Sequence, residues 1–112
     1  MNYEDMSDFE INVRVAEHLP LRIHENQSAS VKCKPSGVLC DDLIETYEFN
    51  PCNSPSDTWP IIVDNKIAIA PAKATAGMWF GSSADGSLCA PMDSNPLRAA
   101  MIVFLIMNDG ES

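Results

Sequence analysis

The segment Pro96–Met107, PLRAAMIVFLIM, carries one charged side chain, Arg98, and no other polar one. Asn95 is a good N-cap, Pro96 suits the first helical position, and Gly110 is typical of a helix end. A helix that is apolar all round must be covered on several sides or lie in a membrane. This segment spans about 18 Å, which is too short for the roughly 30 Å core of a bilayer. We therefore predict a core helix covered by a sheet and by further elements.

A second helix is predicted at the other end of the chain, from Asp8 to Glu17 or His18. Ser7 and Glu10 have the spacing of a capping box, in which each side chain accepts a hydrogen bond from the other residue's backbone N–H. The apolar residues of this helix cover more than one narrow stripe. We therefore expect it to contact more than the sheet.

A third helix is predicted from Pro55 to about Asn65. Ser54 suits the N-cap, and Asp57 places a negative charge near the positive end of the helix. Pro60 removes one backbone hydrogen bond and favours a kink. Four large aromatic residues in the second half of the chain are predicted to lie in the core, namely Trp59, Trp79, Phe80 and Phe104.

Short strands are predicted between the helices. Alternating and β-branched residues place them at 21–24, 29–33, 66–70 and 76–81, with a further one at 87–90. Most of the segment 34–52 has no clear pattern of apolar and polar residues and is given no assignment, although the alternation at 43–49 favours a strand over a helix. The sequence thus predicts one α+β domain over residues 1–112. Its expected architecture is a small antiparallel sheet of four to five strands with helices on both faces and the mostly apolar C-terminal helix in the core.

The chain is strongly acidic, with 16 Asp and Glu against 7 Lys and Arg and a net charge of −9. Direct binding to a nucleic-acid backbone is not expected, since it needs clustered basic residues. Binding to an anionic membrane surface is not expected for the same reason. The first ten residues lack the apolar stretch of a signal peptide, which predicts a cytoplasmic protein. The four cysteines are then expected to be free thiols: Cys33, Cys40, Cys52 and Cys89.

The sequence contains no recognisable catalytic or metal-binding motif. His18 or His24 could act as a base for Cys52, but a buried thiol with surface histidines is the preferred interpretation. The adjacent Asp41 and Asp42 lack the spacing of a calcium loop, and the cysteines lack that of a zinc site. We therefore predict no metal and no cofactor.

Arg98 falls in the first turn of its helix, where the helix dipole disfavours a cation. A structural ion pair with Asp57 or Asp93, or a clamp on backbone carbonyls, is preferred over an anchor for a ligand or partner chain. Trp59 with Pro60 would form an interface anchor if the central helix is partly exposed. The candidate partner-binding residues are therefore Trp59, Pro60, Asp57 and Arg98.

Three segments resemble a known family: residues 6–12 (MSDFEIN), 50–62 (which begins with NPCN and ends with DTWPII) and 95–105 (NPLRAAMIVFL). They resemble the NinX-type proteins of lambdoid phages and prophages of enteric bacteria, a family with no assigned activity. The resemblance covers roughly a third of the chain, and the last segment is the most specific. It implies a setting in the bacterial cytoplasm during phage growth. The family is similar, more distantly, to phage domains described as α/β/α sandwiches, which agrees with a layered fold.

Three functional hypotheses follow. The first is a non-catalytic interaction module that binds an unidentified host or phage protein and forms a homodimer. The second is an acidic mimic of nucleic acid, which requires carboxylates aligned on one face. The third is a small hydrolase or metal-dependent enzyme, which requires a pocket holding His24 or Cys52 beside acids with shifted pKa values. The absence of catalytic motifs favours the first hypothesis.

Overall fold

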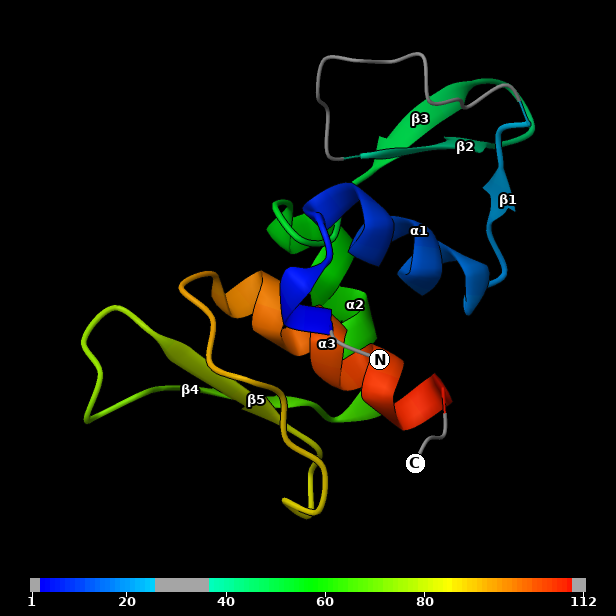
Figure 1. Ribbon diagram of the computed structural model, residues 1–112. Helices are drawn as coiled ribbons and strands as arrows, with labels where there is room; N and C mark the ends of the chain where they lie inside the picture. Colours follow the sequence, from blue (N-terminus) through cyan, green and yellow to red (C-terminus); the bar gives the residue numbers. More distant parts are fainter. Residues whose placement is uncertain (1–2, 26–36, 110–112) are drawn as a thin grey trace.

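The computed structural model describes residues 3–25 and 37–109. In these residues, three α-helices lie between two small antiparallel sheets (Figure 1). The elements follow in the order η1 (Tyr3–Asp5), α1 (Asp8–Glu17), β1 (Arg22–Ile23), β2 (Val38–Asp41), β3 (Thr46–Phe49), α2 (Pro55–Asn65), β4 (Ala68–Pro71), β5 (Trp79–Ser82) and α3 (Pro96–Asp109). The predicted strand at 29–33, Cys33 and the helix end at Gly110 lie outside the described residues.

The α+β class is confirmed, but the strands are arranged differently from the expected single sheet. One sheet has the order β1-β2-β3, and the other consists of β4 and β5. In the first sheet, Val38 pairs with Phe49 and Cys40 pairs with Tyr47. The helices lie between the two sheets, so the strands before α2 do not pair with those after it (Figure 1). The helices therefore form a layer shared by both sheets, rather than covering both faces of one.

The predicted strands are present in part. The expectations at 21–24, 43–49, 66–70 and 76–81 correspond to β1, β3, β4 and β5, with bounds that differ by a few residues. Strand β2 lies in the segment that had no assignment. The expected strand at 87–90 is reduced to an isolated bridge between Ser82 and Cys89, and a second bridge joins Trp79 to Asp93.

Helix α1 begins as its sequence predicts. The Ser7 hydroxyl accepts a hydrogen bond from the Glu10 backbone N–H at 3.1 Å, and the Glu10 carboxylate accepts one from the Ser7 N–H at 2.9 Å. This capping box satisfies two of the backbone N–H groups that a helix start leaves unpaired. The helix then buries Ile11, Val15 and Ala16 against the rest of the core.

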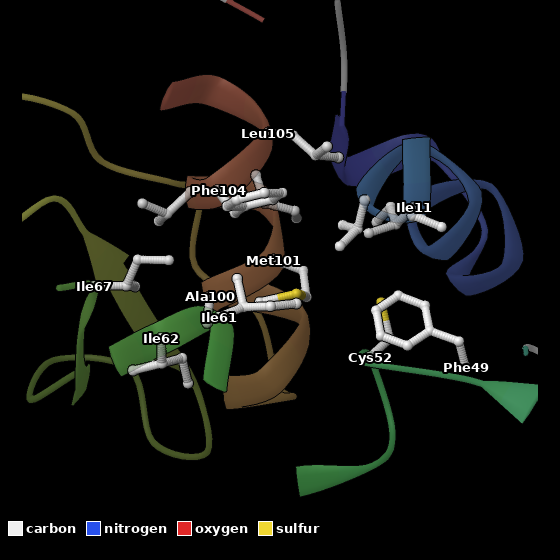
Figure 2. Close-up of a cluster of buried hydrophobic side chains, with 14 of the residues drawn as sticks. Ile11, Phe49, Cys52, Ile61, Ile62, Ile67, Ala100, Met101, Phe104 and Leu105 are labelled. Carbon is white, nitrogen blue, oxygen red and sulfur yellow. The ribbon is translucent and has the colours of Figure 1, made fainter. Parts of the chain in front are cut away.

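Helix α3 is the centre of the core. Every residue from Ala99 to Leu105 is at most 3% exposed. The β4–β5 hairpin contacts this helix, and α1 and α2 contact it as well. Figure 2 shows side chains of all three helices gathered around Met101, including Ile11 of α1 and Ile61 of α2. The predicted apolar core helix with cover on several sides is therefore confirmed. Within the described residues, no helix has the length and apolar character needed to cross a membrane.

Gly81 marks the place where β5 comes closest to α3. A Cβ atom here would lie 2.8 Å from Val103 Cγ2 and 2.9 Å from the Ala99 carbonyl oxygen. The carbonyl belongs to a packed helix and cannot move away without shifting the whole element. We expect Gly81→Ala to lower the free energy of unfolding by about 1–3 kcal/mol, measured by urea denaturation. Ala70→Ser, on the exposed side of β4, should change it by less than about 0.5 kcal/mol, and equal stability of the two variants would contradict the close packing.

Candidate functional site

The Arg98 side chain is 13% exposed, and its guanidinium group binds two carboxylates and two backbone carbonyls. Its Nε donates to Asp8 Oδ1 at 3.0 Å, and its Nη1 donates to Asp93 Oδ2. Its Nη2 donates to the backbone carbonyls of Met6 and Tyr3. The structural ion pair and carbonyl clamp expected from the sequence are therefore both present, with Asp93 as one partner. The second partner, Asp8, was not anticipated.

The electrostatics of this cluster favour the charged guanidinium. Burial lowers the pKa of Arg98, but the hydrogen bond and charge of Asp93, together with the charge of Asp8, outweigh burial and raise it. The carboxylates of Asp8 and Asp93 share one cation, Arg98, so the cluster has a net negative charge. Arg98 consequently acts as a fixed cation that joins the start of α1 to the start of α3, because Asp8 is the first residue of α1 and Met6 precedes its N-cap.

A second set of polar contacts lies beside the first and involves the buried Asn12 of α1. Its Nδ2 donates to Asn50 Oδ1 at 2.7 Å, and its Oδ1 accepts from the Cys52 backbone N–H at 3.0 Å. An amide side chain can donate and accept at once, which is what a fully buried position requires. Asn12 therefore fixes the loop that precedes α2 against α1. Asn53 adds a hydrogen bond to Asp8 Oδ2 at 3.1 Å.

Asn95 completes this network from α3. Its Oδ1 accepts from the backbone N–H of Leu97 at 2.9 Å, which is the predicted N-cap. Its Nδ2 donates to the Cys52 carbonyl at 2.6 Å. One amide thus begins α3 and holds the loop before α2. Ser54, by contrast, makes no capping bond with its side chain, although α2 does begin at Pro55.

The candidate residues of α2 lie on its outer surface. Trp59 is 63% exposed and Val63 is 51% exposed, and Pro60 between them is exposed as well. The prediction that Trp59 belongs to the core is therefore wrong. The third candidate on this helix, Asp57, is half-buried and accepts a hydrogen bond from the Asn50 backbone N–H at 2.8 Å. Trp59, Pro60 and Val63 are called the α2 face below.

Thr58 explains why Trp59 points outward. It is fully buried, and its hydroxyl donates to the carbonyls of Ser54 and Pro51. These bonds fix which side of α2 faces the core and place the next residue, Trp59, outside. Of the other aromatic residues predicted in the core, Phe104 is buried, Trp79 is half-buried and Phe80 is 44% exposed.

A comparison with protein families assigns the chain to one of them. The family described as "Bacteriophage P22, NinX" matches residues 2–108. The chain belongs to the NinX family. The match extends through residues 19–48 and 71–94, which carry none of the three recognisable segments. No curated protein matches the chain at a significant level.

The segments that carry the NinX resemblance contain Arg98, Asn12 and Asn95, whose contacts make up the polar network described above. Residues 6–12 contain Asp8 and Asn12, residues 50–62 contain the loop that both helices hold, and residues 95–105 contain Asn95 and Arg98. In this NinX chain, these side chains bind one another and fix the three helix starts relative to each other. The motif residues therefore build the scaffold. Trp59 and Pro60 of the α2 face lie in the second segment but make none of these scaffold contacts, and Val63 follows that segment directly.

Cys52 of the NinX chain is fully buried beside this network. Burial raises the pKa of its thiol, and the charge of Asp8 raises it further. A thiol with a raised pKa stays protonated at neutral pH and is a poor nucleophile. His24, one of the two bases considered for Cys52, directly follows β1, where its Nδ1 is 2.8 Å from Oδ1 of Asp41 in β2. Among the described residues, no cluster of three or more His, Cys, Asp or Glu side chains could hold a metal ion.

An open depression of about 620 Å³ lies over the Arg98 cluster. Met6, Met78 and Met92 contribute apolar walls, and Asp8 and Asp93 contribute charge. Both carboxylates already accept hydrogen bonds from Arg98. The depression therefore belongs to the scaffold, and Arg98 binds both of its carboxylates from within.

Proposed function

We propose that this NinX-family member is a phage accessory protein that acts as a non-catalytic interaction module and binds a host or phage protein through the α2 face. The observation that carries the proposal is the 63% exposure of Trp59 beside the exposed Val63. A large aromatic side chain held outside by a rigid helix is the kind of residue that dominates the binding energy of protein interfaces. Pro60 adds apolar surface without flexibility.

The charge of the chain indicates which partner fits this face. Helix α2 contains Asp57 and Asp64 but no Lys or Arg, and the whole chain has a net charge of −9. Complementary charge speeds association and suppresses wrong partners. The partner is therefore a protein with an apolar pocket for Trp59 and basic residues around it. A second copy carries the same net negative charge, so the proposed partner is a different protein.

The roles of Arg98 and Cys52 support a non-catalytic module. Arg98, the strongest candidate for holding a ligand, already binds two carboxylates and two carbonyls. Cys52 is buried with a raised pKa. The remaining polar groups of the network hold helix starts together, and this is a structural use of the residues that could otherwise have formed an active site.

The test is recovery of tagged protein from phage-infected bacteria, comparing wild type with Trp59→Ala and Phe80→Ala. We expect one stoichiometric partner with wild type and Phe80→Ala, and at least a ten-fold loss with Trp59→Ala, since truncating an anchor costs about 2 kcal/mol or more. Both aromatic residues are partly exposed, so the two variants have matched chemistry at different sites. Melting temperatures check that both variants fold.

Two results would overturn the proposal. One is a partner that binds Trp59→Ala as tightly as wild type, because the α2 face would then not be the binding surface. The other is recovery of the protein with no partner, or only with further copies of itself in sedimentation analysis. The latter result would favour the homodimer expected from the sequence without a second protein.

A further inference from the structure

The turn that joins β2 to β3 exposes two large aliphatic side chains. Leu43 and Ile44 are each 92% exposed, more than any other large apolar residue in the described part of the chain. The β2–β3 hairpin lies on the outer side of the helical layer, away from the β4–β5 hairpin (Figure 1). We call Leu43 and Ile44 the hairpin tip. Neither residue belongs to the hydrophobic core cluster.

The requirements of a hairpin turn do not explain why Leu43 and Ile44 occupy these two positions. The turn is closed by a hydrogen bond from the Asp42 backbone N–H to the Glu45 carbonyl at 2.8 Å. Two-residue turns in hairpins favour Asn-Gly or similar pairs, which adopt positive φ without strain. Lys66 is the only described non-glycine residue with positive φ, so the tip adopts a turn that fits the strand twist less well. Leu and the β-branched Ile also lack the side-chain hydrogen bonds that stabilise turns.

Negative charge flanks the tip in the hairpin itself, while Arg22 of the neighbouring β1 lies opposite Asp41 and His24 contacts that carboxylate. Residues 37–49 contain four acidic residues and no Lys or Arg, and the acids are Asp41, Asp42, Glu45 and Glu48. Asp42 and Glu45 flank the tip directly, and both are exposed. This charge opposes contact with an anionic membrane surface or a nucleic-acid backbone. It equally opposes contact with a second copy of this acidic chain. It favours a protein whose apolar pocket has a basic rim.

We propose that the hairpin tip is a docking element that inserts Leu43 and Ile44 into an apolar pocket of a partner protein. Asp42 and Glu45 then pair with Lys or Arg residues at the rim of that pocket. The inference is independent of the α2 face, because it depends on a different element and on different residues. Insertion of two large aliphatic side chains into a pocket is favourable, because it removes their exposed apolar surface from water.

The first experiment separates docking from folding. Leu43→Asn combined with Ile44→Gly removes the tip and introduces the pair that hairpin turns favour. We expect the melting temperature of this double variant to equal or exceed that of wild type. A clear decrease would show that the tip supports the fold, and this result would overturn the proposal.

The second experiment identifies what the tip contacts. A benzophenone amino acid replaces Ile44 in the full chain, expressed in phage-infected bacteria and irradiated there, with the same probe at the exposed Lys73 as the control position. We expect one protein cross-linked at position 44 and none in comparable yield at position 73. Peptide mapping should place the cross-link beside apolar residues flanked by Lys or Arg. Adding Glu45→Lys should lower the yield about ten-fold, since it reverses the charge beside the tip.

The other outcomes contradict the proposal. Cross-links to a second copy of the chain, to lipid or to nucleic acid would each name a different occupant. An unchanged cross-linking yield with Glu45→Lys would show that the pocket of the partner has no basic rim, which the proposal requires. Equal yields at positions 44 and 73, or no cross-link at either, would show that the tip is not a docking element. Trp59→Ala, tested separately, should leave the cross-link at position 44 in place if the two surfaces act independently.

Discussion

A chain that ends at Ser94 is expected to remain unfolded, because it lacks the helix around which the core is built. Helix α3 contributes the continuous buried run from Ala99 to Leu105, and both α1 and α2 pack on it. The total stability of a domain is only about 5–15 kcal/mol, which is less than the loss of so much buried apolar surface. Circular dichroism and thermal unfolding of the truncated protein provide the measurement. Soluble truncated protein that unfolds cooperatively would refute the expectation.

Two point variants test the central position of α3 in the core without removing residues. Leu105→Lys places a charge at a fully buried position of α3 and should destabilise the protein enough to prevent cooperative folding. Asn108→Lys introduces the same side chain at an exposed position of the same helix, where a cation near the C-terminus is favourable. We expect Asn108→Lys to unfold like wild type. Similar behaviour of the two variants would contradict the central position of α3.

Replacement of Arg98 by Ala is expected to produce the largest effect of any substitution in the polar network. The side chain is mostly buried between Asp8 and Asp93, and its removal would leave two carboxylates without their cation. Loss of one partner from a buried ion pair destabilises a protein by about 3–5 kcal/mol. Urea denaturation at neutral pH measures this change. The exposed Arg22 of β1 serves as the control, and Arg22→Ala should cost less than about 1 kcal/mol.

Arg98→Lys distinguishes the charge of the side chain from its geometry. Lysine keeps the positive charge but cannot bind two carboxylates and two carbonyls with a planar fork. We therefore expect a stability between those of Arg98→Ala and wild type. If Arg98→Ala were no less stable than Arg22→Ala, the cluster would be a surface ion pair and would not hold the helix starts together.

The helices could be predicted because their signals are local. Ser7 and Glu10 are three residues apart, and their side chains bind each other's backbone as the spacing indicates. Asn95 and Pro96 likewise define the start of α3 without reference to the rest of the chain. Such short-range patterns determine where a helix begins regardless of the fold around it.

The sheets could not be predicted in the same way, because strand pairing depends on contacts between distant residues. In β2, Val38 and Cys40 are buried, but the apolar Leu39 between them is 37% exposed, which hides the alternation that marks a strand. The separation into two sheets results from the position of the helices. The outward direction of Trp59 similarly depends on Thr58 and its bond to Pro51, a contact that the helical pattern does not contain.

The Arg98 cluster shows the same limit at the candidate site. Asp93 lies five residues from Arg98 in sequence, and it was among the expected partners. Asp8 lies 90 residues away, and no pattern in the sequence connects the two. Trp59 with Pro60 was predicted as an interface only as an alternative to core packing, and Val63 was not among the candidates. The identity of an apolar residue on a helix does not show whether the residue is buried or exposed.

The contact between Arg98 and Asp8 also has a consequence for the synthesis of the protein. A ribosome extends the chain by about 5–20 residues per second, so the 90 residues that separate the two take roughly 5 to 20 seconds. During this interval the α1 segment, and later also the α2 segment, lacks the helix that covers it. The core can close only when α3 has been made, so the segments that it covers complete their packing together after that point. Until then, the apolar sides of α1 and α2 are open to chaperones and to other nascent chains.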